Sequence, residues 1–112
     1  MALGLGFTSL SVSSVDAAVR SNNVIQMASA YDPAEEVRCL EAFINSNFNI
    51  AHNICLSLAQ KGARDAQLVT GIMYALGEGV DQNNQLAKLW LSEAERNGSI
   101  DAGEALSQFK LK

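Results

Sequence analysis

The side chains in this sequence with the greatest capacity for chemistry are two cysteines, Cys39 and Cys55, and a single histidine, His52. His52 and Cys55 form an H-x-x-C spacing, which on one helix could supply two ligands to a metal ion. A structural zinc site takes four ligands, and the sequence has no further Cys or His to complete it. A Cys–His nucleophile pair would also need a third group that orients the histidine, and none is visible. We therefore expect no metal site and no catalytic residue, and we interpret His52 as solvated or partly packed.

The spacing of the two cysteines suits a disulfide across a helical hairpin. If two antiparallel helices turn near residue 47, Cys39 and Cys55 lie at the same height, because they are equally far from the turn. In an exported chain such a pair is expected to form a bridge. The alternative is two separate buried thiols, each packed as a small apolar side chain.

Three further motifs are better explained by structure than by chemistry. Gly77-Glu78-Gly79 contains G-x-G but lacks both a preceding strand and the G-K-[ST] of a phosphate loop, so we expect no cofactor. Glu35/Glu36 and Glu93/Glu95 are more simply helix caps and solvated faces than acid–base pairs. Asn97-Gly98-Ser99 is formally a glycosylation acceptor, but its role in ending a helix explains it fully.

The composition indicates one packed domain. The chain has 112 residues, of which 48% are apolar and 18% charged. Eight basic and 12 acidic residues give a net charge of −4, and no Lys/Arg cluster is present, so nucleic acid is a poor candidate partner. No apolar run reaches the ~20 residues of a membrane-spanning helix.

The first residues are typical of a signal peptide. Residues 2–15 carry no charge, and Val15 and Ala17 are small residues two positions apart, which suits cleavage after Ala17. No Lys or Arg precedes the apolar run, and the alternative is a mildly apolar N-terminal tail. We expect residues 1–17 to be a signal peptide and the protein to be extracytoplasmic, either periplasmic or secreted.

Helix signals recur from residue 32 onwards, whereas strand signals are nearly absent, so the expected fold is all-α. Asp32-Pro33 combines a capping side chain with a proline at the first helical position, and Gly62, Gly77 and Gly98 each follow an apolar helical pattern. Residues 18–31 form a weaker helix candidate or a linker. The other expected helices span about residues 33–44, 49–61, 65–76, 84–96 and 99–109.

Small and capping residues recur with a period of 36, which predicts helical hairpins arranged as an α/α superhelical repeat. The pairs separated by 36 positions are Ala51 and Ala87, Gly62 and Gly98, Asp65 and Asp101, and Ala66 and Ala102.

A set of small and aromatic residues carries a family resemblance. They lie between residues 66 and 98. The first half of this stretch contains Ala66, Gly71, Met73, Tyr74, Gly77, Gly79 and Val80, and the second half contains Ala87, Trp90, Ala94 and Gly98. Their spacing resembles a Sel-one-like repeat, a relative of the tetratricopeptide repeat. The departures from the family pattern are Thr70 for Leu, Asn83 for an acidic residue and Glu95 for Ala.

The physical roles of these residues follow from their size. Gly71 and Ala87 lack bulk, so the two helices can approach closely, and Tyr74 and Trp90 fill the space beside that contact. Gly77, Gly79 and Gly98 permit positive φ in the turns.

The resemblance divides the chain into a degenerate hairpin at 32–62, one good repeat at 63–98 and a C-terminal capping helix at 99–112. About three repeats are usually needed for a stable array, so a disulfide or a homo-oligomer could supply the stability that the missing repeats would give.

The resemblance implies a non-enzymatic module that binds another protein or peptide, in an adaptor, assembly or immunity-type role. Some cysteine-rich members of the family are described as β-lactamase-like hydrolases, an activity that would require a Ser-x-x-Lys nucleophile arrangement or an equivalent. A third interpretation is a fragment of a longer repeat scaffold.

The partner site follows from tetratricopeptide geometry, in which the first helix of each hairpin lines a concave surface. This places Leu68 and Ile72 on the groove face, with Glu104 and Gln108 at the same positions one period later. The alternative is that Leu68 and Ile72 are core residues covered by residues 19–30.

Overall fold

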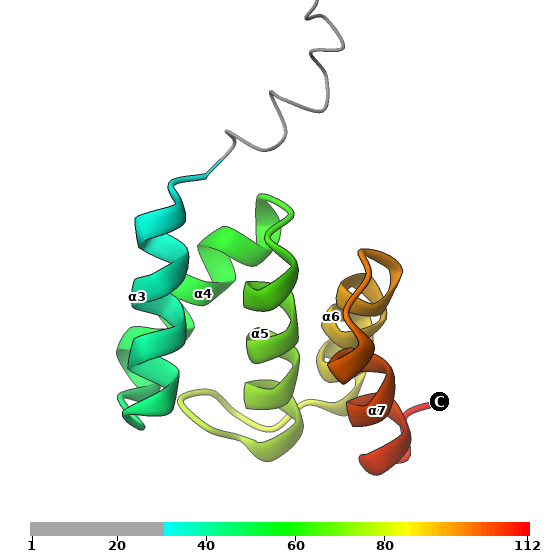
Figure 1. The fold of residues 1–112 in the computed structure, drawn as a ribbon. Helices are drawn as coiled ribbons and strands as arrows, with labels where there is room; N and C mark the ends of the chain where they lie inside the picture. The colour runs from blue at the N-terminus through cyan, green and yellow to red at the C-terminus, as the bar shows by residue number, and fades with distance from the viewer. Residues whose placement is uncertain (1–30) are drawn as a thin grey trace, which may run out of the picture. The chain divides into compact units, whose positions relative to one another are not determined.

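The computed structural model of the chain describes residues 31–112, which form an all-α array of packed helices without a strand (Figure 1). The helices are α3 (Pro33–Ile44), α4 (Phe48–Gln60), α5 (Arg64–Leu76), α6 (Asn84–Arg96) and α7 (Ile100–Gln108). This confirms the predicted fold class. The predicted signal peptide at 1–17 and almost all of the helix or linker at 18–31 lie outside the described residues.

Local sequence signals explain where the helices begin and end. Asp32 accepts a hydrogen bond from the Ala34 backbone N–H at 2.9 Å, which caps α3 ahead of Pro33. Asn83 and Ser99 cap α6 and α7 in the same way. At the ends of helices the chain turns through positive φ, which glycine adopts without strain: Gly62 at 98°, Gly77 at 72° and Gly98 at 102°.

The period of 36 is present in the backbone. Helices α4 and α6 both have 13 residues, and both of their ends are 36 positions apart. Helices α5 and α7 begin 36 positions apart, and the turns before them carry equivalent hydrogen bonds, from Ala63 N–H to Leu58 O at 3.0 Å and from Ser99 N–H to Ala94 O at 2.9 Å.

The first hairpin departs from this period. Helix α3 ends at Ile44, 32 positions before α5 ends at Leu76, because residues 45–47 make a shorter turn than residues 77–83. Asn47 N–H reaches back to Ala42 O at 2.8 Å to form this turn, and Ser46 takes a positive φ of 63°. The two hairpins therefore differ in their loops while keeping the same second helix.

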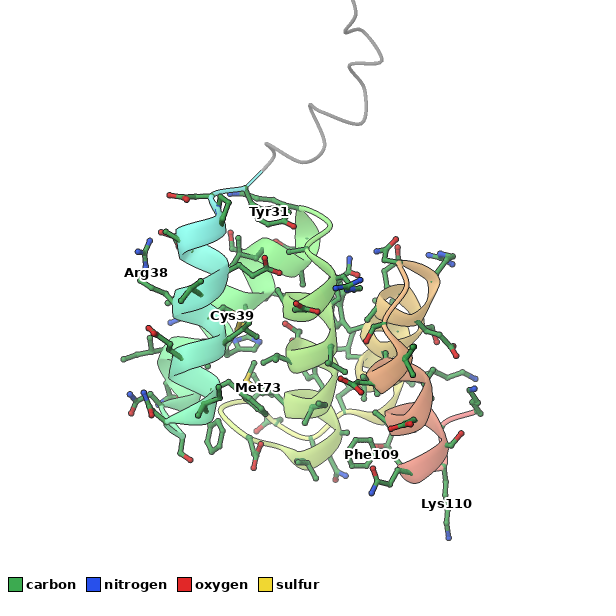
Figure 2. The ribbon with its side chains drawn as sticks, viewed as in Figure 1. Tyr31, Arg38, Cys39, Met73, Phe109 and Lys110 are labelled. Atoms are coloured by element: carbon green, nitrogen blue, oxygen red, sulfur yellow. A yellow bond between two sulfur atoms is a disulfide. The ribbon has the colours of Figure 1, made fainter. Side chains whose placement is uncertain are left out.

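The helices pack around two apolar clusters, and Cys39 and Met73 of the first are labelled in Figure 2. The first lies among α3, α4 and α5 and contains the two cysteines, Leu58 and Met73, with Trp90 packed partly buried against it. The second joins α6 to α7 through Leu91 and Leu106, with Leu68 of α5 beside it. Many of the remaining buried residues are alanines, which let the helices approach closely.

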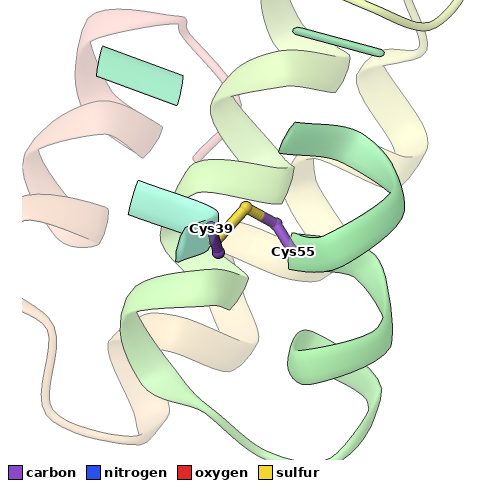
Figure 3. Close-up of a disulfide and its surroundings, with 2 residues drawn as sticks. All are labelled: Cys39 and Cys55. Carbon is purple, nitrogen blue, oxygen red and sulfur yellow. A yellow bond between two sulfur atoms is a disulfide. The ribbon is translucent and has the colours of Figure 1, made fainter. Parts of the chain in front are cut away.

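Each hairpin is joined at one close contact. In the first, Cys39 of α3 and Cys55 of α4 form a disulfide, with Cα atoms 5.0 Å apart (Figure 3). This confirms the predicted pairing. In the second, Gly71 of α5 faces Leu91 of α6, where a Cβ on residue 71 would come within 2.6 Å of Leu91 Cγ. Leu91 follows Cys55 by 36 positions and Gly71 follows Cys39 by 32, so the two contacts are structurally equivalent.

Candidate functional site

An open groove runs along the side of α7 that turns away from the second apolar cluster. Two of the predicted partner residues, Glu104 and Gln108, line it, and both are exposed. Its other lining residues are Glu95, Gly98, Ser99, Ile100, Gly103, Ser107 and Lys112.

The other two predicted partner residues lie elsewhere. Leu68 and Ile72 are partly buried and pack against the second apolar cluster, which α6 and α7 form. The structure therefore does not gather the four residues into one groove. Equivalent positions on α5 and α7 have different surroundings, because α7 itself packs beside α5, whereas no described helix lies over Glu104 and Gln108.

The floor of the groove is shaped by a glycine and a carboxylate. Gly103 lacks a side chain, and a Cβ there would come within 2.6 Å of Glu95 Oε2. Lys112 Nζ lies 3.4 Å from the same oxygen. Glu95 thus places a negatively charged carboxylate against the backbone of α7, where it already attracts the ammonium group of Lys112.

At the position on α5 that is equivalent to Gly103, two neutral side-chain amides fill the space. Gln67 precedes Gly103 by 36 positions and is buried. Its Nε2 donates to Ala59 O at 3.1 Å, and its Oε1 accepts from Asn97 Nδ2 at 2.8 Å. At α5 this polar contact joins α4, α5 and the end of α6, whereas at α7 the corresponding space is the open groove.

Several groove residues were not predicted from the sequence, although one signal pointed to Glu95. Glu95 stood out as a departure from the repeat pattern, where alanine is usual. Ile100 is 79% exposed at the edge of the groove and offers an apolar contact. Gly103 and Lys112 carried no signal of their own, because their roles depend on how the Glu95 side chain lies across α7.

The structural residues of the repeat fall where close packing requires them, with one difference. Ala87 and Ala94 are fully buried. Leu91 rather than Trp90 contacts Gly71, and Trp90 is partly buried against the first cluster instead. The smaller branched side chain fits beside the glycine, and the indole packs on the first cluster.

Gly79 has a packing role besides its φ of 76°. A Cβ there would come within 2.6 Å of Phe48 O, so the loop between α5 and α6 lies directly on the start of α4. The ring of Phe48 in turn packs on that of Phe43, with centroids 5.9 Å apart.

His52 belongs to a contact between the hairpins. Its Nε2 lies 3.3 Å from the Tyr74 hydroxyl, and the two rings meet edge to face with centroids 5.6 Å apart. Burial lowers the pKa of His52, since it disfavours the charged imidazolium. Cys55 is consumed by the disulfide, so its sulfur is neither a thiolate nucleophile nor a metal ligand. Within residues 31–112, no group of three or more His, Cys, Asp or Glu side chains could hold a metal ion.

Three of the four glutamates that the sequence pointed to take part in surface ion pairs. Arg38 pairs with Glu35 and Arg96 with Glu93, each three positions along one helix and partly or largely exposed. Burial raises the pKa of Glu36, and the nearby Asp65 raises it further.

The chain does contain one Ser-x-x-Lys spacing, from Ser107 to Lys110. Ser107 lies on α7 and lines the groove, whereas Lys110 lies beyond the end of the helix, with a positive φ of 60°. Both are exposed. Activation of a serine by lysine needs a desolvated amine that is held against the hydroxyl, and this arrangement is open to water.

Comparison with known proteins adds no relative. The chain matches no protein-family model, and its comparisons with curated proteins and with solved structures give no match. The Sel-one-like resemblance therefore stays a prediction that rests on the quoted residues.

Proposed function

We propose that this chain is a non-enzymatic protein-interaction module that uses the α7 groove to hold a helix or an extended peptide of another protein. The observation that carries the proposal is the groove itself, an open surface with an acidic, small-residue floor and an exposed apolar edge. Interaction surfaces commonly combine an apolar contact with a polar rim in this way.

The chemistry of the groove defines the partner. Glu95 and Glu104 favour hydrogen-bond donors and cationic side chains, as the Lys112 ammonium near Glu95 illustrates. The small side chain of Ser107 allows a backbone to approach closely, and Ile100 offers an apolar contact. The expected partner segment is therefore basic, with one apolar side chain beside its positive charge.

An extracytoplasmic location fits this role. The Cys39–Cys55 disulfide is fully buried, and disulfides persist in oxidising compartments. None of the described helices is long and apolar enough to cross a membrane. The signal-peptide pattern at residues 1–17 supports the same proposal.

Site-specific photocrosslinking tests the groove. A photoreactive residue at Gln108 should crosslink one defined partner in the native envelope or secreted fraction. Lys88, exposed on α6, is the matched control and should give no such product. Glu104→Lys should abolish the Gln108 product while the thermal melt stays unchanged, because the residue is exposed. Equal crosslinking from both positions would refute the groove as the binding surface.

The hydrolase alternative has one observation in its favour, the Ser107–Lys110 spacing beside the groove. A nitrocefin-type assay decides it. Turnover above buffer that is lost in Ser107→Ala would replace the interaction proposal with an enzymatic one.

A further inference from the structure

The turn between α6 and α7 contains the only Asn-Gly pair of the chain, Asn97-Gly98. In such a pair the glycine backbone nitrogen can attack the asparagine side-chain carbonyl, because glycine has no side chain to hinder the approach. A bond forms between Gly98 N and Asn97 Cγ, the Cγ–Nδ2 bond breaks, and the amide leaves as ammonia with the Gly98 N–H proton. Water then opens the five-membered ring to give aspartate or isoaspartate.

The native turn holds both reacting groups away from this reaction. Asn97 has a ψ of 9°, so the Gly98 nitrogen nearly eclipses the backbone nitrogen of Asn97 instead of approaching its Cβ. The Gly98 N–H also donates to Glu95 O at 2.9 Å.

The side-chain amide is held as well. Asn97 Nδ2 donates to Gln67 Oε1 at 2.8 Å, and Gln67 is buried and donates to Ala59 O. The reaction therefore needs the Gln67 contact to break and the turn to rotate about the Asn97 backbone.

We propose that Asn97 is a spontaneous deamidation site that the folded α6–α7 turn suppresses and that local opening of this turn exposes. The product replaces a hydrogen-bond donor with a carboxylate at the negatively polarised end of α6, facing the buried Gln67 oxygen. Reclosure of the turn is then unfavourable. Because Gly98 and Ser99 line the α7 groove, the new charge lies at its edge.

Peptide mass spectrometry after incubation at mildly alkaline pH tests the suppression. Rapid acidic digestion then preserves the product distribution. Deamidation at Asn97 should be slower in the folded protein than in denaturant by about tenfold or more, because only the opened turn reacts. Asn45 is an internal control, since it ends α3 with a similar ψ of 6° but precedes Ser46, whose side chain hinders attack. It should react slowly in both conditions.

Gln67→Met tests whether the Gln67 contact suppresses the reaction. The variant removes the hydrogen-bond acceptor of the Asn97 amide while keeping an unbranched side chain. In the folded variant, deamidation at Asn97 should accelerate about two- to tenfold, the range expected for one lost hydrogen bond. In denaturant its rate should equal that of the wild type, and Asn45 should be unaffected. The proposal is overturned if folded and denatured wild type react equally fast, if Gln67→Met leaves the Asn97 rate unchanged, or if Asn45 accelerates in parallel.

Discussion

In the α3–α4 hairpin a disulfide joins the two helices, whereas in the α5–α6 hairpin Gly71 lets Leu91 pack against the backbone of α5. Both contacts occur at equivalent heights, since Cys55 and Leu91 occupy the same position of α4 and α6. The first hairpin lacks a glycine at this point and has the shorter loop. A covalent bond thus takes the place that close packing takes in the second hairpin, and the two should respond to different perturbations.

Truncating the packed contact should have the largest effect. Leu91 is fully buried, so Leu91→Ala should lower the free energy of unfolding by about 2–5 kcal/mol. That is a large fraction of the ~5–15 kcal/mol typical of a domain. Denaturant unfolding measures the loss. Leu89→Ala is the matched control on the same helix, because Leu89 is 52% exposed and its loss should change stability little.

A double-mutant cycle separates this contact from general loss of core. Gly71→Ala alone should destabilise by about 1–3 kcal/mol through overpacking against Leu91. In the Leu91→Ala background the added methyl group has room, so its cost should shrink or reverse. Additive costs would show that Gly71 and Leu91 do not depend on each other.

Removing the disulfide should lower the stability slightly less than Leu91→Ala does. Cys39→Ala with Cys55→Ala should lower the free energy of unfolding by about 3 kcal/mol, the loop-closure value for a bridge spanning 16 positions. A reductant should shift the unfolding midpoint of the wild type and leave that of the double variant unchanged. An identical midpoint for reduced and oxidised wild type would mean that packing alone holds the first hairpin.

Moving the bridge tests whether the two contacts are equivalent. Gly71→Cys with Leu91→Cys, introduced into the variant without native cysteines, should form a disulfide that is detected as an absence of free thiols. Oxidation should then stabilise this protein by about 3 kcal/mol relative to its own reduced form, the loop-closure value for this bridge, because the leucine packing is absent from both forms. Two persistent free thiols in the folded protein would reject the structural equivalence.

The smallest effect concerns the contact between the hairpins, His52 with Tyr74. Burial lowers the pKa of His52 below its ordinary value of 6.5, so the unfolded chain takes up this proton at a higher pH than the folded one. The stabilising contribution is present above about pH 6.5 and is lost as the pH falls from 6.5 towards the lowered pKa. Thermal melts across this range should show a decline that His52→Gln reduces. An equal decline in both proteins would assign the pH dependence to other groups.

The helices and their ends were predictable from the sequence because their causes are local. Asp32 and Pro33 start α3 through bonds within a single turn, and Gly62, Gly77 and Gly98 stop helices by their own backbone freedom. The height of Cys39 opposite Cys55 was also predictable, since two antiparallel helices of equal rise bring residues equidistant from their turn to the same level. The period of 36 follows from the same local signals.

The contacts between helices were decided only in three dimensions. The sequence could not indicate that Leu91, rather than Trp90, lies on Gly71, or that α7 shields Leu68 and Ile72 while leaving Glu104 and Gln108 in an open groove. It also did not place the Glu95 carboxylate over Gly103. Each depends on how far one helix rotates and crosses over its neighbour, which many weak contacts between residues distant in sequence determine together.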